Sequence, residues 1–171
     1  MSPARPTTCS PTIGCAGSRE ARRGRSPWRR ASRRVARGAG AVVVHPGARP
    51  VVHPDDVRRC VAALADHDGA VLGRPVADTL KLATEGEIQG TVDRAYLFRA
   101  ETPQAFPRAL FEKALAAAAV DRFVGTDEAS LVERLPGVRL ASVEAEHPNP
   151  KLTTRADLTL VAALLRYDPA P

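Results

Sequence analysis

Five polar side chains stand where the chain leaves an apolar run or enters a turn, and together they could bind an anion: Arg49, Arg94, Thr102, Thr126 and Lys151. In an open α/β sheet, ligands bind beyond the carboxyl ends of the strands, which is where these residues are expected. Cations and hydroxyls at such an edge suit phosphoryl-type transfer, which depends on positioning and on neutralising developing negative charge. Composition and periodicity alone predict an α/β domain that binds something anionic.

Other kinds of site find little support in the sequence. No metal-ligand spacing relates His45, His53, His67 and His147, and no Ser-His-Asp or Cys-His arrangement follows from spacing. Cys9, Cys15 and Cys60 are an odd number without paired spacing, so neither a disulfide framework nor a zinc site is predicted. Cys60 is expected to be a half-buried, inert thiol on a helix. This cysteine usage indicates a reducing, cytoplasmic location, and no apolar run is long enough to span a membrane.

Residues 41–72 predict a β-α-β unit. Ala41–Val44 is a continuous β-branched run, which is typical of a strand buried within a parallel sheet. Pro54 suits the first position of a helix, and Gly69 is expected to end that helix. A second strand then begins at Ala70.

An extended arm is predicted at about residues 79–93. Two stretches of strand-forming residues flank the turn pair Glu85-Gly86, which favours a β-hairpin. The remaining elements are a strand at 97–100 that runs into Thr102, a helix opened by Pro107, a helix capped by Thr126, a strand at 138–143 and a helix capped by Thr154. The order β, α, β, hairpin, β, α, α, β, α is that of an α/β domain with an inserted arm.

The basic charge of the chain is concentrated in residues 1–40, where ten Arg face a single acid, Glu20. The other 131 residues hold 15 Lys and Arg against 18 Asp and Glu, so the high isoelectric point says nothing about the partner of the folded part. Without hydrophobic periodicity, the head is expected to be disordered or poorly packed. It could instead be a misassigned or frame-shifted start, a nucleic-acid arm or an organelle transit peptide, and the sequence favours disorder or the wrong start.

Six short motifs follow one another in a fixed order along residues 41–166. They are Val42–Pro50, Asp68–Val71, Pro75–Lys81, Thr91–Arg94 with Thr102–Phe106, Thr126–Ser130, and Asn149–Thr153 with Asp157-Leu158. In this order and at these separations, the series resembles the C-terminal part of the 2-C-methyl-D-erythritol 4-phosphate cytidylyltransferase family, of which it covers somewhat more than half the usual length.

That resemblance implies a Rossmann-like nucleotidyltransferase fold, which is a three-layer α/β sandwich, and a homodimer whose subunits exchange the arm. It implies transfer of CMP from CTP to 2-C-methyl-D-erythritol 4-phosphate with release of pyrophosphate, assisted by Mg²⁺, in isoprenoid precursor synthesis. Lys151 matches the family lysine near the α-phosphate and Arg49 the arginine near the substrate, so these two are the expected catalytic residues. Arg94, Thr102 and Thr126 match residues that hold the sugar phosphate, with Arg94 reaching across the dimer from the arm.

Two departures from the family pattern bear on activity. Pro46 stands where the family has an aspartate that helps to bind ribose and metal, and proline offers neither a charge nor an N–H, so no metal ligand is assigned. The family's Gly-rich loop, which wraps the triphosphate with backbone N–H groups, has no counterpart in residues 1–40. We therefore expect a fold truncated at its N-terminus, with residues 41–171 as a partial cytidylyltransferase domain, and little or no turnover.

Two alternatives stay open at this stage. The first is a related cytidylyltransferase acting on a polyol phosphate such as ribitol 5-phosphate. The motifs Thr91–Arg94 and Thr126–Glu128 favour methylerythritol phosphate as the substrate over this alternative. The second is a non-catalytic remnant that binds a partner through its arm, or nucleic acid through its Arg-rich head. No base-reading motif accompanies the arginines, which argues against nucleic acid.

Overall fold

The computed structural model describes residues 38–167 and leaves residues 1–37 and 168–171 undescribed. The prediction for the head at residues 1–40 therefore lies almost wholly outside the described residues, as do Cys9 and Cys15. In chain order the described elements are β1 (Ala41–Val44), α2 (Pro54–Ala62), the short 3-10 helix η2 (Ala63–Ala65), β2 (Gly69–Pro75), β3 (Leu80–Thr84), β4 (Glu87–Val92), β5 (Phe98–Pro107), α3 (Arg108–Val120), α4 (Ala129–Val132), β6 (Leu140–Glu144) and α5 (Asp157–Tyr167).

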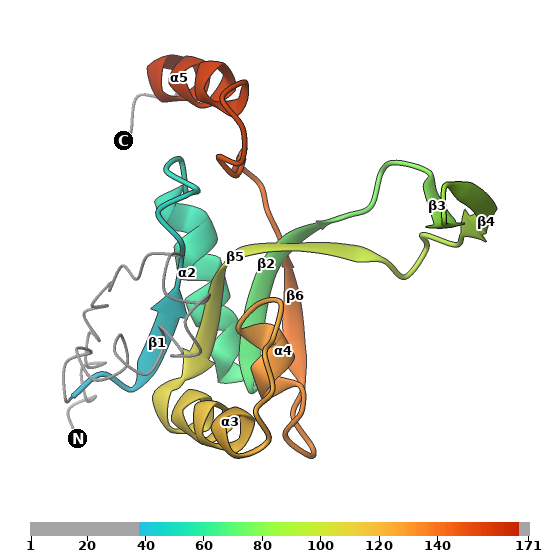
Figure 1. Ribbon diagram of the computed structural model, residues 1–171. Coiled ribbons are helices and arrows are strands. Elements are labelled where there is room, and N and C mark those ends of the chain that lie inside the picture. The colour runs from blue at the N-terminus through green and yellow to red at the C-terminus, as the bar shows by residue number, and fades with distance from the viewer. Residues whose placement is uncertain (1–37, 168–171) are drawn as a thin grey trace.

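A mixed four-stranded sheet of order β1-β5-β2-β6 forms the body of the molecule (Figure 1). β5 runs antiparallel to both β1 and β2, whereas β2 and β6 are parallel. The prediction that Ala41–Val44 lies within a parallel sheet is wrong, because its neighbour in the described sheet is the antiparallel β5. A valine run favours a buried strand but carries no information about the direction of its partner. The β-α-β unit is present, with β5 inserted between its two parallel strands.

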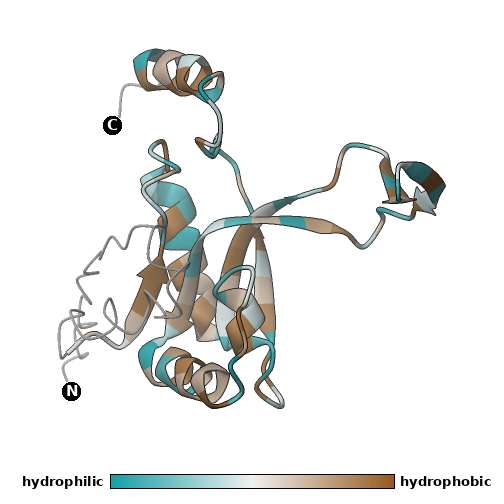
Figure 2. Ribbon diagram, in the orientation of Figure 1, coloured by the Kyte–Doolittle hydropathy of each residue, from teal (hydrophilic) through white to brown (hydrophobic). Residues whose placement is uncertain are grey.

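Helices cover both faces of the sheet and give the predicted three layers. On one face, Cys60 of α2 packs with Ala70 and Leu72 of β2. On the other face, Phe106 of β5 and Phe111 of α3 stack with their ring centroids 5.4 Å apart, in a cluster that α4 completes. Successive strand residues point to opposite faces, so each central strand contributes to both cores. Figure 2 shows hydrophobic residues concentrated on the strands of this body.

The predicted arm is confirmed as a separate two-stranded hairpin of β3 and β4, which projects away from the body (Figure 1). Its turn is the expected pair Glu85-Gly86, with φ of 53° and 86°. Positive φ at both central residues is the condition for a type I′ turn, whose twist matches that of the flanking strands. Apolar side chains on the arm are exposed, including Leu82 and Ile88.

β5 is a single strand of ten residues, longer than the stretch 97–100 predicted for it. Thr102 therefore lies inside a strand and not in a loop that follows one. Pro103 cannot donate to a ladder, but the pairing with β2 is irregular between Val71 and Gly73, opposite this part of β5. The N–H group that Pro103 lacks is therefore not needed, because the hydrogen bonding between β2 and β5 is already interrupted at this point. The sequence of β5 alone could not indicate this interruption.

Two helix boundaries differ from prediction. Helical structure after Pro54 ends at Ala65, and Gly69 begins β2. Thr126 does not cap α4, because the Asp127 carboxylate accepts the hydrogen bond from the Ser130 N–H at 2.9 Å. The start of α5 agrees with prediction, because the Asp157 carboxylate accepts a hydrogen bond from the Thr154 N–H at 2.7 Å, which is one half of the predicted capping box. The Thr153 N–H donates to the same carboxylate, and these hydrogen bonds lower the pKa of Asp157 to about 2.

Cys60 is fully buried and not half-buried as expected, because it packs between α2 and β2. Burial raises the pKa of its thiol to about 12, which agrees with the inert role expected of it. None of the helices within residues 38–167 combines the length and apolar character that crossing a membrane requires.

Candidate functional site

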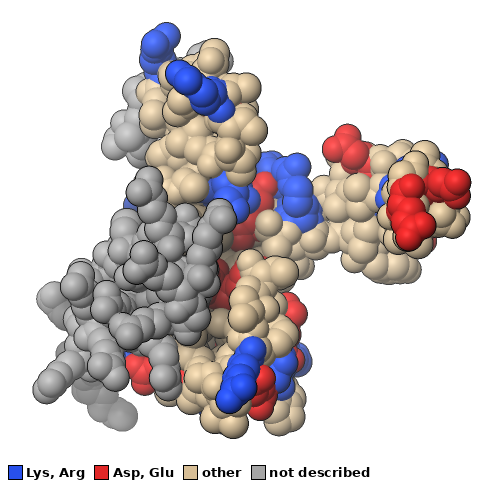
Figure 3. All heavy atoms as spheres, in the orientation of Figure 1, with Lys and Arg blue, Asp and Glu red and all other residues tan. Residues whose placement is uncertain are grey.

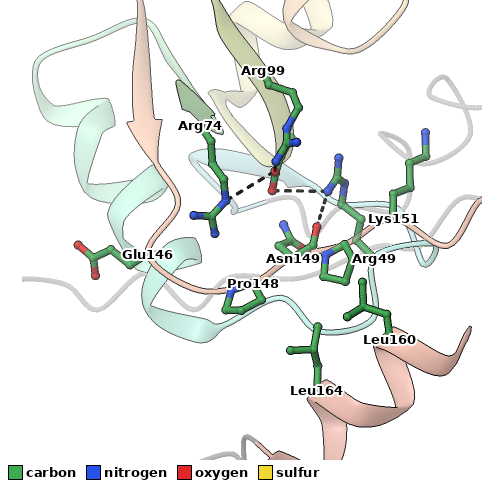
Figure 4. A pocket seen from close by; sticks show the side chains of 11 residues that line it. Arg49, Arg74, Arg99, Glu146, Pro148, Asn149, Lys151, Leu160 and Leu164 are labelled. Carbon is green, nitrogen blue, oxygen red and sulfur yellow. Dashed lines mark hydrogen bonds and ion pairs between the residues drawn. The ribbon is translucent and has the colours of Figure 1, made fainter. Parts of the chain in front are cut away.

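A cavity of about 690 Å³ opens at the end of the sheet nearest the arm, between the body and α5 (Figure 4). Its walls come from the loop after β1, the arm-side ends of β2 and β5, the loop after β6 and one side of α5. The residues that line it are Arg49, Arg74, Arg99, Glu101, Glu146, Pro148, Asn149, Pro150, Lys151, Leu160 and Leu164. Four cations and two carboxylates in one cavity favour an anionic ligand.

His45 holds the loop that carries Arg49. Its Nε2 lies 2.7 Å from the Arg49 carbonyl oxygen, and its Nδ1 lies 2.9 Å from the Thr102 hydroxyl. Burial lowers the pKa of His45 below its usual value, so the ring is neutral near pH 7. A carbonyl can only accept, so Nε2 is the donor and Nδ1 accepts from Thr102. Thr102 thus supports the loop from within β5, and it does not line the cavity.

The Arg49 side chain is fixed on two sides. Its guanidinium donates a hydrogen bond to the Asn149 carbonyl oxygen and lies 3.5 Å from a carboxylate oxygen of Glu101. The side chain is 13% exposed, and burial lowers the pKa of Arg49 while Glu101 acts in the opposite direction. A guanidinium keeps its charge even so. Arg49 therefore presents a preorganised positive charge at the wall of the cavity.

The loop after β6 carries Lys151 to the same cavity and is anchored at several points. The Asn149 amide donates to the Thr102 carbonyl oxygen at 2.5 Å, and the Leu152 N–H donates to the Ala48 carbonyl oxygen at 2.7 Å. These bonds join the loop to β5 and to the loop that carries Arg49. Lys151 itself is exposed, so its flexible ammonium can follow a ligand.

Asp56 of α2 anchors the beginning of that loop from beneath. Its carboxylate is 1% exposed and accepts hydrogen bonds from the N–H groups of Glu146, at 3.2 Å, and His147, at 3.4 Å. Arg59 lies 3.4 Å from the same carboxylate, and the His147 ring stacks on His53 with centroids 3.6 Å apart. A buried carboxylate is tolerated because it is paired and hydrogen-bonded.

The structure brings together only some of the predicted site residues. Arg49 and Lys151 line one cavity, as expected for residues that bind the same ligand. Arg94 and Thr126 are exposed and lie outside the lining of this cavity in the single chain. Convergence of Arg94 on the cleft therefore stays a prediction for the dimer, in which the arm of one subunit would serve the other.

Sequence reasoning missed four charged residues of the cavity, which are Arg74, Arg99, Glu101 and Glu146. Arg74 and Arg99 face each other as register partners on β2 and β5, and Glu101 lies two residues beyond Arg99. Had the predicted strand at 97–100 been extended by a few residues, Arg99 and Glu101 would have been expected on the same face of it. That shared face was the sequence signal for these two residues.

Glu128, at the start of α4, gives the molecule a pH dependence that can be tested. It is 5% exposed, and burial raises its pKa to about 7 from a usual 4.5, with Asp127 adding to the shift and Lys151 opposing it. The unfolded chain releases this proton first as the pH rises, so stability falls between about pH 4.5 and pH 7, by at most roughly 3 kcal/mol. Melting temperatures measured across this range should decline in the native chain and decline less in Glu128→Gln. Glu133→Gln, at an exposed position, is the control and should decline as the native chain does. An equally steep decline in Glu128→Gln would contradict the raised pKa of Glu128.

A magnesium ion is implied by the family resemblance, and Mg²⁺ prefers carboxylate and phosphate oxygens. Within residues 38–167 there is no cluster of three or more acidic, His or Cys side chains that could hold a metal. Glu101, the buried carboxylate of the cavity, is engaged by arginines. The described residues therefore offer magnesium no cage of three protein ligands.

Comparison with known proteins agrees with the geometry. A sequence model described as 2-C-methyl-D-erythritol 4-phosphate cytidylyltransferase matches residues 28–167. Relatives of that name include one from Syntrophotalea carbinolica, 45% identical over 124 residues (72% of this chain and 53% of the relative). Another, from Bacillus velezensis, is 42% identical over 127 residues (74% and 55%). The chain thus spans about half the length of the curated relatives it matches.

Solved structures show the same fold. The crystal structure of 2-C-methyl-D-erythritol 4-phosphate cytidylyltransferase from Thermus thermophilus superposes with a TM-score of 0.73 at 37% identity, covering 82% of this chain and 68% of that chain. The predicted Rossmann-like nucleotidyltransferase fold is confirmed. By its sequence and its fold, the chain belongs to the 2-C-methyl-D-erythritol 4-phosphate cytidylyltransferase family.

Proposed function

We propose that this chain binds 2-C-methyl-D-erythritol 4-phosphate in the cavity beside α5 and orients it to receive CMP from CTP. The observation that carries the proposal is that Arg49 and Lys151, from loops about 100 residues apart in the chain, line one cavity in a member of this family. The two negative charges of a phosphate group would balance the positive charges of Arg49 and Lys151.

In the proposed reaction, an oxygen of the sugar phosphate attacks the α-phosphorus of CTP. A new P–O bond forms, the bond from the α-phosphorus to the bridging oxygen breaks, and pyrophosphate leaves. Negative charge accumulates on the oxygens around the α-phosphorus, and preorganised cations stabilise it most. Arg49 is held in place and is suited to the acceptor phosphate, whereas Lys151 is exposed and is suited to the α-phosphate.

We also infer that two copies of the chain associate through the arm. Every residue of β3 and β4 is exposed in the single chain, including Leu82 at 59% and Ile88 at 68%. In such a pair, Arg94, Thr102 and Thr126 could take the roles predicted for them only if the arm of one copy reached the cavity of the other. A cytoplasmic location likewise stays a prediction from cysteine usage.

The proposal is tested by titrating the purified chain with 2-C-methyl-D-erythritol 4-phosphate and, separately, with ribitol 5-phosphate. We expect the methylerythritol phosphate to bind at least tenfold more tightly, and any release of pyrophosphate to require both CTP and this sugar phosphate. Given Pro46, we expect that release to be slow. Tighter binding of ribitol 5-phosphate would establish the alternative substrate, and no binding of either would leave the proposed function without support.

A further inference from the structure

Arg74 and Arg99 are placed side by side by the sheet. They are register partners on the antiparallel strands β2 and β5, so their side chains leave the same face. Glu101 follows Arg99 by two residues and leaves that face as well. Figure 4 shows Arg74 and Arg99 reaching from neighbouring strands toward the same carboxylate at the cavity wall.

Glu101 gathers three guanidinium groups around one buried carboxylate. It is 5% exposed, and it lies 3.1 Å from Arg99, 3.5 Å from Arg49 and 3.9 Å from Arg74. One negative charge cannot neutralise three positive charges, so the cluster keeps a surplus of positive charge at the cavity. Figure 3 shows basic side chains beside acidic ones in the region between α5 and the arm.

Much of the hydrogen-bonding capacity of these two arginines is still available. A guanidinium has five N–H donors. Arg74 donates one to the His147 carbonyl oxygen at 2.5 Å, which fixes its direction, and Arg99 donates one to Glu101 at 3.1 Å. Arg99 is 64% exposed, so its remaining donors are open to a ligand that enters the cavity. Adjacent guanidinium forks with surplus charge match the geometry of a phosphate group.

We propose that Arg74 and Arg99, held beside Arg49 by Glu101, bind a phosphate group and extend the ligand site along the arm-side wall of the cavity. This inference rests on the proposed function, because it takes the phosphate to be the phosphomonoester of the acceptor sugar. The same chemistry could come from the triphosphate of CTP, and the experiment separates these two sources.

Binding of inorganic phosphate, 2-C-methyl-D-erythritol 4-phosphate and CTP is measured by calorimetric titration of the native chain and of Arg99→Ala. Arg99 is the decisive position, because it is exposed and its loss should leave the fold intact, whereas Arg74 also holds the loop at His147. We expect Arg99→Ala to weaken binding of phosphate and of the sugar phosphate by about tenfold, as the loss of a charged hydrogen bond predicts, and to change CTP binding less. Arg58→Ala, which removes an arginine 73% exposed on α2, is the matched control and should change none of the three.

The outcomes separate this inference from the proposed function. Equal phosphate affinity in Arg99→Ala and Arg58→Ala, or no phosphate binding by the native chain at millimolar concentration, would overturn the inference. A larger loss for CTP than for the sugar phosphate would overturn the assignment to the acceptor. Phosphate binding could depend on Arg99 while the chain showed no preference for methylerythritol phosphate over ribitol 5-phosphate. That result would support this inference and contradict the proposed substrate.

Discussion

Replacement of Arg49 by alanine is expected to weaken binding of 2-C-methyl-D-erythritol 4-phosphate by roughly 100-fold, the upper range for loss of hydrogen bonds to a charged group. The reason is geometric as well as electrostatic. The guanidinium is held by the Asn149 carbonyl and by Glu101 before any ligand arrives, so little entropy is lost when it binds phosphate. Calorimetric titration of the variant and the native chain measures the difference.

Arg49→Lys separates charge from geometry. A lysine keeps the positive charge but cannot contact the Asn149 carbonyl and Glu101 with one planar group. We therefore expect it to recover less than half of the lost binding free energy. Full recovery would show that charge alone matters, and a loss no greater than that of Arg58→Ala would remove Arg49 from the site. A melting curve for each variant confirms that the fold is retained.

Asp56→Ala is expected to lower the free energy of unfolding by about 3 kcal/mol, which is typical for breaking a buried, paired charge. The substitution removes the acceptor for the Glu146 and His147 N–H groups and the partner of Arg59. It also frees the start of the loop that carries Lys151, so sugar-phosphate affinity should fall as well. Urea denaturation followed by circular dichroism measures the stability change.

Asp55→Ala provides the control for that experiment within the same helical turn. Asp55 is 52% exposed and pairs with Arg58 at the surface, where an ion pair contributes little. Its removal should cost no more than about 0.5 kcal/mol. Equal losses in the two variants would indicate that the charge at the start of α2, and not the anchoring of the loop, is what matters.

Much of the fold could be predicted because it rests on local signals. The alternation of apolar runs and helical stripes located all the main elements, and Glu85-Gly86 located the hairpin turn. What could not be predicted depends on partners distant in the chain. The direction of β1 is decided by β5, more than 50 residues later, and the extent of β5 depends on an irregularity in β2. Neither is written in the residues of the strand itself.

The site shows the same division. Arg49 and Lys151 belong to motifs that mark loops, and the structure places both at one cavity. Arg74 and Arg99 lie in strands, where a charged residue normally indicates nothing more than a solvated face. Their role depends on cross-strand register and on a buried Glu101, and both require the assembled sheet. Thr102 was predicted as a ligand contact, and in the single chain its hydroxyl supports His45.

The continuity of β5 restricts how this chain can change length during evolution. At one end of the strand Phe106 fills the core, and toward the other end Arg99 and Glu101 face the cavity. Inserting or deleting one residue between them would turn one of these sets to the wrong side of the sheet. Within the single chain, the hairpin tip at Glu85-Gly86 does not have to keep side chains on particular faces of the sheet. Natural variation in length should therefore collect at the tip and be absent from β5.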